Sequence, residues 1–401
     1  MKIGIAGPVA LEHISDLIAI GSTNLPKGYG GAPFMGTLVR TLLARGHEVS
    51  VYSTTAGLSP SRTHFETAIN GRFRVYFCAA RRRSFAVENG YVGRMVDFFK
   101  VERRNLLAAI NDDKPDVIHA HWTYEFALAG IAAQRPCVVT VHDSPFRVLR
   151  FNPNLYRLGR MLMALRVLRT SRVLTAVSPY VATQVERIAR VPLAIIPNPM
   201  PELKSSGVNV VPFVNSSPII AMVTNGWGRL KNSAQGMAAF QKLRERIPNA
   251  TLKLFGQDYG PGEFAEQYAT KHQIRVGIEF IGSLPHGKLM EELKHVDILL
   301  HPSYEEACPL TLIEAMANGI PVVAGRNSGG VPWVLGYGEC GLLTDISSAE
   351  SMSSALFQLL GDPVLIIRLR NAGRKRSLCC FSPEVVARLY EERYIDAINR
   401  Y

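Results

Sequence analysis

Two glutamates in the second half of the chain are spaced so that both can face one bound anion. Glu306 lies in the stretch Pro-Ser-Tyr-Glu-Glu, and Glu314 lies about one turn into a helix predicted to begin near Leu310. The unbonded N–H groups at a helix start, together with its positive dipole end, favour an anion such as a diphosphate. The two carboxylates would flank that anion. The spacing alone proves nothing, because Glu384 and Glu392 repeat the same interval in what looks like an ordinary terminal helix.

Two histidines are predicted at strand ends in the first half of the chain. In the run Asp-Val-Ile-His-Ala-His-Trp, the alternation of side chains puts His121 at the end of the strand, and His142 ends the next strand. A histidine in this position can hydrogen-bond a ligand at the sheet edge. A lone histidine is more often a satisfied structural residue, so the residues by themselves leave both interpretations open.

A glycine-rich loop comes between the first predicted strand and the first helix. It has the sequence Gly-Tyr-Gly-Gly-Ala-Pro and includes Gly30 and Gly31. Glycine lets a backbone approach a ligand closely, which makes this pair a candidate binding element. A plain turn accounts for a glycine pair as well.

The elements that must position these residues follow an alternating pattern. Short β-branched runs alternate with amphipathic segments of helical length, which is typical of parallel sheets. A helix is predicted from about Pro33 to Arg45, with Gly46 at its C-cap. The predicted strands of the first half are Lys2–Ala6, Val49–Ser53, Phe73–Cys78, Asp116–Ala120, Cys137–His142, Val173–Ala176 and Ala194–Ile196. Those of the second half are Pro218–Val223, Thr251–Phe255, Val276–Ile281, Ile298–His301, Pro321–Ala324 and Gly341–Leu343.

The length of 401 residues favours two domains, because one hydrophobic core rarely supports more than about 300 residues. The stretch between Asn198 and Pro218 is rich in proline and serine and has no usable periodicity. We therefore predict an N-terminal domain over 1–198, a linker over 199–217, a C-terminal domain over 218–380, and a terminal helix over 381–401 that returns to the first domain. Open α/β sheets bind ligands at the carboxyl ends of their strands.

Charge is distributed unevenly between the halves. Residues 1–200 hold 25 Lys and Arg against 13 Asp and Glu, whereas residues 201–401 hold 20 of each, so the net charge of +12 belongs to the first half. This basic half could meet an anionic membrane surface or an acidic acceptor, or simply be a solvated face. No pattern of a nucleic-acid-binding motif accompanies the charge, so nucleic acid is not an expected partner.

The sequence has no run of 18 apolar residues and no convincing signal peptide. Its six cysteines form no zinc-type pairs and are sparse for so long a chain. The expected location is the cytoplasm, with peripheral association at the inner membrane face as an extension of that expectation.

Taken together, these motifs resemble the retaining glycosyltransferases of the GT-B type, above all family four, which uses UDP-sugars or GDP-mannose. The glutamate pair is followed by Ala-Met-Ala-Asn-Gly-Ile-Pro-Val at 315–322, and the first helix ends in Arg-Gly-His-Glu-Val at 45–49. The matches occur in the family's order over nearly the whole chain. The resemblance implies an α/β fold of two Rossmann-like, doubly wound parallel-sheet domains facing a central cleft. It also implies a retaining transferase that moves a hexose from a nucleotide sugar to a hydroxyl of a sugar, lipid-linked or small-molecule acceptor, in polysaccharide or glycolipid assembly.

The same resemblance implies roles for individual residues. Glu306 would lie beside the transferred sugar, and Glu314 would hydrogen-bond the ribose hydroxyls. The diphosphate would be held by Lys231 and by the N–H groups of Leu310, Thr311 and Leu312. His121 would contact the donor sugar or the acceptor. Glycine loops that include Gly30, Gly31 and Gly282 would admit the base and phosphates.

Two positions depart from the family's pattern. The usual second cation lies five residues before Lys231, where this chain has Gly226. Arg229 either supplies that charge from a displaced position or faces solvent. A glutamate usually follows the Ser-Gly-Gly-Val-Pro loop, and here Trp333 stands instead. These departures leave a non-catalytic GT-B subunit as the alternative function.

No cofactor is expected beyond the nucleotide-sugar co-substrate. The chain has no Asp-x-Asp motif to hold magnesium, so cations and backbone dipoles would have to stabilise the leaving diphosphate. A dinucleotide dehydrogenase is excluded, because Gly7-Pro8-Val9-Ala10 after the first strand does not match G-x-G-x-x-G.

Overall fold

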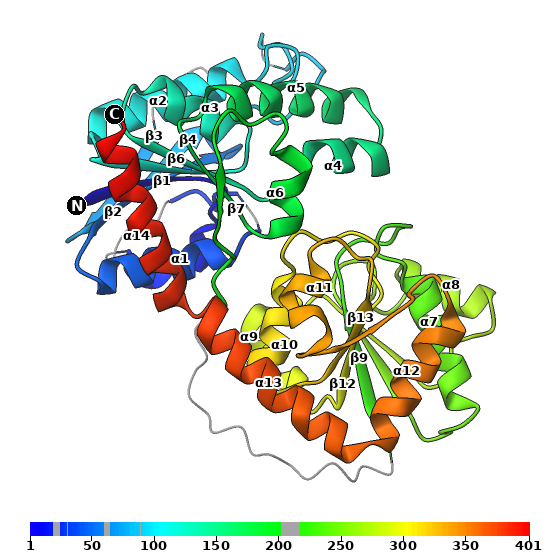
Figure 1. Ribbon diagram of the computed structural model, residues 1–401. Coiled ribbons are helices and arrows are strands. Elements are labelled where there is room, and N and C mark those ends of the chain that lie inside the picture. The colour runs from blue at the N-terminus through cyan, green and yellow to red at the C-terminus, as the bar shows by residue number, and fades with distance from the viewer. Residues whose placement is uncertain (19–24, 30, 60–64, 89, 202–216) are drawn as a thin grey trace. The chain divides into compact units, whose positions relative to one another are not determined.

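The computed structural model describes residues 1–18, 25–29, 31–59, 65–88, 90–201 and 217–401. The chain forms two compact units, each built on its own sheet (Figure 1). Unit 1 comprises Met1–Glu202 with Pro383–Tyr401, and unit 2 comprises Leu203–Ser382. The predicted linker over 199–217 falls mostly on residues outside the described ones.

Unit 1 contains an eight-stranded sheet in the order β3-β4-β2-β1-β5-β6-β7-β8. Its strands are β1 (Lys2–Ala6), β2 (Glu48–Thr55), β3 (Phe65–Asn70), β4 (Phe73–Ala79), β5 (Val117–His121), β6 (Cys137–Val141), β7 (Val173–Ala176) and β8 (Leu193–Ile195). All pairings are parallel except that of β3 with β4. The sequence prediction missed β3. The two-residue connection between β3 and β4, Gly71-Arg72, has glycine in its first position, which is a hairpin signal that could have found it.

The helices of unit 1 lie on both faces of the sheet (Figure 1). Helices α1 and α14 pack together on one face, and α2 and α3 pack together against strands from the other. The helices are α1 (Phe34–Ala44), α2 (Lys100–Asp113), α3 (Glu125–Ala132), α4 (Pro145–Phe151), α5 (Leu155–Thr170), α6 (Pro179–Val185) and α14 (Pro383–Asn399), with 3₁₀ turns at Leu11–His13 and Ser15–Leu17.

Helix α14 reaches unit 1 from the far end of the sequence and is fixed there by polar contacts. Arg45 donates two hydrogen bonds of 2.6 Å to the carboxylate of Glu391, and His47 lies 2.8 Å from the same group. The buried hydroxyl of Tyr394 lies 2.8 Å from Nδ1 of His119 in β5. The Arg-Gly-His segment after α1 therefore holds the C-terminal helix.

Unit 2 contains a six-stranded, fully parallel sheet in the order β11-β10-β9-β12-β13-β14. Its strands are β9 (Ile219–Val223), β10 (Thr251–Phe255), β11 (Ile278–Gly282), β12 (Ile298–His301), β13 (Val322–Gly325) and β14 (Leu342–Thr344). Its helices are α7 (Ser233–Arg244), α8 (Phe264–Lys271), α9 (His286–Leu293), α10 (Leu310–Ala317), α11 (Val331–Val334), α12 (Ala349–Gly361) and α13 (Pro363–Phe381), with a 3₁₀ turn at Gly336–Gly338. The predicted parallel sheets are thus confirmed in both units.

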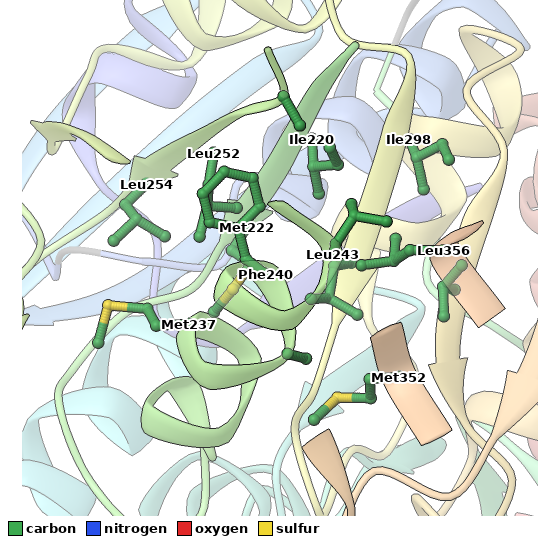
Figure 2. Close-up of a cluster of buried hydrophobic side chains, with 14 of the residues drawn as sticks. Ile220, Met222, Met237, Phe240, Leu243, Leu252, Leu254, Ile298, Met352 and Leu356 are labelled. Carbon is green, nitrogen blue, oxygen red and sulfur yellow. The ribbon is translucent and has the colours of Figure 1, made fainter. Parts of the chain in front are cut away.

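The core of unit 2 lies between its sheet and the helices α7 and α12 (Figure 2). Met222 in β9, Leu252 in β10 and Phe240 in α7 are fully buried there, as are Met352 and other residues of α12. Each large apolar side chain contributes about 1.5–3 kcal/mol by leaving water. This packing fixes the strands whose ends carry the candidate site.

Each sheet has one position where the strand order reverses. In unit 1 the chain passes from β1 to β2 on one side and returns to β5 on the other; in unit 2 it passes from β9 to β10 and returns to β12. In open parallel sheets, ligands bind outside the carboxyl ends of the strands at such a switch point. The loops after β1, β5, β9 and β12 are therefore the first places to search for function.

Within the described residues no single helix has the length and apolar composition of a membrane span. One bent pair, Ala349–Gly361 (α12) followed by Pro363–Asn399 (α13 and α14 taken together), meets those criteria jointly, with a bend of 97°. The same residues include no group of three or more His, Cys, Asp and Glu side chains arranged to hold a metal ion.

Candidate functional site

At the switch point of unit 2, two loops that were predicted from the sequence to carry site residues lie together. The loop after β9 carries Lys231, and the loop after β12 carries Glu306. The backbone N–H of Tyr304 donates to the carbonyl of Leu230 at 2.9 Å, so the two loops are joined next to both side chains. The backbone N–H of Gly330 donates to the carbonyl of Glu306 at 2.7 Å and fixes the loop from the other side.

Lys231 and Glu306 form an ion pair at this position. Their Nζ and Oε1 atoms are 2.8 Å apart, and the side chains are 27% and 17% exposed. Nε2 of His301, the last residue of β12, lies 3.5 Å from the same carboxylate oxygen. Burial raises the pKa of Glu306, but the nearby His301 and the bonded, charged Lys231 outweigh that effect and lower the pKa to about 2. Glu306 is therefore an anion at any physiological pH.

The start of α10 lies in the same segment and offers N–H groups to an anion. Its N-cap residue is Pro309, which makes no side-chain cap. Among the described residues no partner accepts from the backbone N–H of Leu310 or Thr311, whereas that of Leu312 donates to the carbonyl of Pro309 at 3.2 Å. Two of the three N–H groups predicted to hold a diphosphate are thus unbonded, and the third would have to be shared.

Glu314 lies one turn into α10 and is almost fully buried. Its Oε1 atom lies 2.8 Å from Nε2 of His286, the first residue of α9. The hydrogen bond with this carboxylate raises the pKa of His286. One carboxylate oxygen of Glu314 therefore already has a partner, and the second oxygen is the one available to a ligand.

Two further predicted residues of unit 2, Arg229 and Gly282, differ in their contacts. The Arg229 side chain is exposed and makes no ion pair or hydrogen bond with any described residue. Gly282 ends β11 with a φ of +79°, and a Cβ added there would lie 2.8 Å from the Cα of Gly260. Gly282 thus keeps its chain in close contact with a neighbouring loop at the carboxyl edge of the sheet.

The switch point of unit 1 contains His121 at the end of β5. Its Nδ1 lies 2.8 Å from Nε2 of His142, and both rings are buried beside Phe34. Burial lowers the pKa of His121 to about 3, and burial together with His121 lowers the pKa of His142 well below its usual range. Both imidazoles are therefore neutral, so one ring donates to the other. Nε2 of His121 is buried and has no hydrogen-bond partner among the described residues.

The glycine loop of unit 1 is described in part. Gly30 lies outside the described residues. Gly31 has a φ of +106° and is exposed, with open space where a Cβ would stand. Gly28 is the more constrained residue, because a Cβ there would lie 2.4 Å from the carbonyl oxygen of Val9.

Sequence reasoning missed two histidines of the site, His301 and His286. The strand-end argument applied to His121 would have found His301, which also ends a predicted strand beside a candidate loop. Nothing in the spacing pairs His286 with Glu314, because they lie on different helices 28 residues apart.

Comparisons with known proteins bear on both units. The family model described as Glycosyltransferase Family 4 matches residues 30–201, and that described as Glycosyl transferases group 1 matches residues 210–376. The chain is similar to N-acetyl-alpha-D-glucosaminyl L-malate synthase of Bacillus anthracis, with 26% identity over 95% of this chain and 98% of that protein.

Two solved structures share the fold. Sucrose-phosphate synthase from Thermosynechococcus elongatus superposes with a TM-score of 0.73 at 19% identity, over 100% of both chains. HepE from Anabaena, crystallised in complex with UDP and glucose, superposes with a TM-score of 0.66 at 16% identity, over 98% of both chains. Both matches extend over both units.

Proposed function

Because this chain belongs to glycosyltransferase family 4, a GT-B family of retaining enzymes that transfer a sugar from a nucleotide sugar, we propose that it is a retaining, metal-independent hexosyltransferase using a UDP-sugar or GDP-mannose. The observation that carries the proposal is the Lys231–Glu306 pair at the switch point of unit 2. A cation for the leaving group and an anion for the reacting sugar are held there side by side.

The donor diphosphate is proposed to bind between Lys231 and the start of α10. An ammonium has three donors, so Lys231 can keep its bond to Glu306 and still donate to a phosphate oxygen. The unbonded N–H groups of Leu310 and Thr311 would hold the other oxygens at the positive end of the helix. These groups are fixed before the reaction, so they stabilise the departing charge without having to reorganise.

The ribose is proposed to bind at Glu314. Its second carboxylate oxygen can accept from a ribose hydroxyl while His286 holds the first. The bond to His286 keeps the carboxylate in one orientation, so the nucleoside meets a preformed acceptor. UDP is the nucleotide bound in the HepE complex, which supports UDP as the first donor nucleotide to test.

The reaction is proposed to proceed by substitution on one face of the sugar. The bond from the anomeric carbon to the diphosphate oxygen breaks, and the bond to the acceptor oxygen forms on the same face. The acceptor proton passes to the departing phosphate oxygen, which takes the bonding electron pair. Glu306, held as an anion, steadies the positive charge that develops on the sugar. In unit 1, Nε2 of His121 is proposed to bond a sugar or acceptor hydroxyl.

Cytoplasmic location with peripheral attachment to an anionic membrane is a further part of the proposal. Leu155, Leu158 and Leu162 recur at helical spacing on α5 and are 72%, 40% and 47% exposed. The exposed residues Arg166 and Arg169 continue the same helix. An exposed apolar stripe with neighbouring arginines suits an anionic bilayer, as an enzyme of glycolipid or polysaccharide assembly would need.

A thermal-shift panel tests the donor site. UDP, GDP, ADP and dTDP, with their common sugar conjugates, would be added to the full-length chain with and without magnesium. Ligands that bind the native state raise the melting temperature. We expect a shift with one nucleotide family, independent of magnesium and lost in Lys231→Ala but kept in Lys242→Ala, which removes a lysine exposed on α7. No shift with any nucleotide would contradict the proposal and favour a non-catalytic subunit.

A further inference from the structure

A recess opens in unit 1 beyond the carboxyl ends of β2 and β4. One part has a volume of about 280 Å³, and an adjoining part of about 470 Å³ extends to the glycine loop at Gly28 and Tyr29. Its walls come from the segment after β2, through Ala56 and Leu58, and from the segment after β4, which contains three consecutive arginines. The recess borders the glycine loop, but no residue assigned a role in catalysis or donor binding is among its described lining residues.

Cations dominate the lining of the recess. The charged side chains that line it are Lys27, Arg81, Arg82, Arg83, Glu88 and Arg94. Arg81 is buried and bound by two carboxylates, those of Asp97 at 2.8 Å and Glu102 at 2.7 Å. The other four cations make no ion pair with any described residue, and Glu88 is the one carboxylate that the described part of the lining contains. The free charge facing the recess is therefore positive.

Arg94 is the most informative of these cations. It is half-buried, its guanidinium lies 5.3 Å from the centre of the Phe99 ring, and its Nε is buried with no hydrogen-bond partner among the described residues. Because Nε is closed off from solvent, a ligand in the recess would meet the terminal nitrogens of Arg94, which make no hydrogen bond or ion pair with any described residue. Arg82 lines the same part of the recess, and its one hydrogen bond within the described residues is donated to the carbonyl of Ala56, at 3.3 Å.

We propose that this recess binds the anionic group, a phosphate or carboxylate, of the acceptor. Arginine donates in a planar fork that matches both groups, which favours them over a halide or a neutral hydroxyl. Naming the ligand as the acceptor rests on the proposed function, whereas anion binding itself does not.

The position of the recess suits an acceptor whose anionic end is bound in the recess and whose other end reaches the switch point. It lies at the β4/β2 pair, and the switch point with His121 lies at the β1/β5 pair, two strand spacings away. Neighbouring strands are about 4.8 Å apart, so the separation is about 10 Å. A monosaccharide bearing one anionic group can bridge it, with the anion at Arg82 and Arg94 and a hydroxyl at the switch point. The acceptor class is thus a phosphorylated or acidic sugar, or a lipid whose phosphate reaches the same arginines.

Calorimetric titration of the full-length chain tests the proposal. The probes are D-glucose 6-phosphate, D-glucuronate and inorganic phosphate, with D-glucose as the uncharged control and vesicles with or without phosphatidic acid as the lipid arm. We expect at least one anion to bind and D-glucose not to. Arg94→Gln should weaken that binding at least tenfold and Arg82→Gln several-fold, while Arg187→Gln, an exposed arginine of the same unit, should leave it unchanged.

Each outcome decides the proposal. Binding of a soluble anion that depends on both arginines supports a soluble acceptor, and the same dependence with phosphatidic acid vesicles alone supports a lipid acceptor. Absence of binding to every anion, or equal binding by wild type and Arg82→Gln, overturns the proposal; Arg82 is exposed, so its loss does not threaten the fold. The UDP thermal shift on the same proteins separates this test from that of the donor site, because Arg94→Gln should keep the shift that Lys231→Ala loses.

Discussion

The carboxylate of Glu306 accepts a hydrogen bond from Lys231 and lies 3.5 Å from Nε2 of His301, and its backbone carbonyl accepts from Gly330. A side chain so fixed can present a negative charge to a reacting sugar without having to move. Glu305, the neighbouring glutamate in the same loop, has no proposed role in the reaction. Variants of Glu306 and of Glu305 can therefore be compared, with Glu305 as the control.

Replacing Glu306 by glutamine keeps the shape of the side chain and removes its charge. We expect the turnover of donor and acceptor to fall by about 10²-fold, the typical loss when one electrostatic contact to the transition state is removed. The dissociation constant for UDP should change by less than about threefold, because the sugar rather than the nucleotide faces Glu306. Steady-state kinetics and UDP titration measure the two quantities. Unchanged turnover, or an equal loss in Glu305→Gln, would exclude the assigned role.

The lowered pKa of Glu306 also predicts how stability depends on pH. The carboxyl titrates at about 2 in the folded chain and near its ordinary value of 4.5 when unfolded. Its charge therefore stabilises the fold above pH 4.5, and this contribution is lost as the pH falls towards 2. Urea unfolding of wild type and Glu306→Gln should give a difference in free energy that is constant above about pH 5 and shrinks below it. A difference that does not vary with pH would mean that the carboxylate is not paired in solution.

At the scale of elements, α14 depends on a few polar contacts with unit 1. Glu391 accepts from Arg45 and lies against His47, and these are half-buried rather than fully exposed groups. Exposed ion pairs contribute about 0–1 kcal/mol and breaking buried ones costs about 3–5 kcal/mol. We expect Glu391→Gln to lower the free energy of unfolding by about 1–2 kcal/mol, with no effect from Glu392→Gln, its neighbour in the sequence. Chemical denaturation measures the difference; equal stability of the two variants would show that α14 is held by its apolar face alone.

The strands were predictable because parallel strands buried on both faces are continuous apolar runs. The strands β1, β7, β10 and β12 have the predicted bounds, and most others differ by one or two residues at an end. β3 was missed because its sequence, Phe-Glu-Thr-Ala-Ile-Asn, mixes polar residues into an edge strand. A single pairing to β4 leaves such a strand with a weak apolar signal.

The site was predictable only as separate pieces. Alternation places His121 at a strand end, but the register of β5 with β6 is what brings His142 to 2.8 Å from it. The same holds for Lys231 and Glu306, which are 75 residues apart and meet because β9 and β12 are neighbours. Local sequence cannot supply these pairings, since strand order is a property of the whole sheet. The structure brings each of these pairs together, but the roles assigned to all the site residues, those of Glu306, Lys231 and His121 included, remain predictions.

At the scale of the whole molecule, the two units differ in whether each is formed by one continuous stretch of the chain. Unit 2 is one stretch of chain with its own core, whereas unit 1 is completed by the last helix of the sequence. Tyr390 and Tyr394 of that helix are almost fully buried in unit 1, where Tyr394 meets His119 and Tyr390 lies 3.3 Å from Thr140. A domain with its own contiguous core can fold alone. Unit 1 without α14 would expose these buried polar groups along with the apolar surface around them.

The two fragments should therefore behave differently. We expect residues 203–382 to fold cooperatively and to keep the UDP-induced thermal shift, because every donor-site residue assigned in unit 2 lies within that stretch. Residues 1–202 should fail to fold cooperatively until a peptide of residues 383–401 is added, since that peptide restores the partners of His119 and Thr140. Circular dichroism during thermal unfolding distinguishes the two, and a scrambled peptide of the same composition is the control. If residues 1–202 unfold cooperatively without the peptide, α14 is an addition to a complete domain and not part of its core.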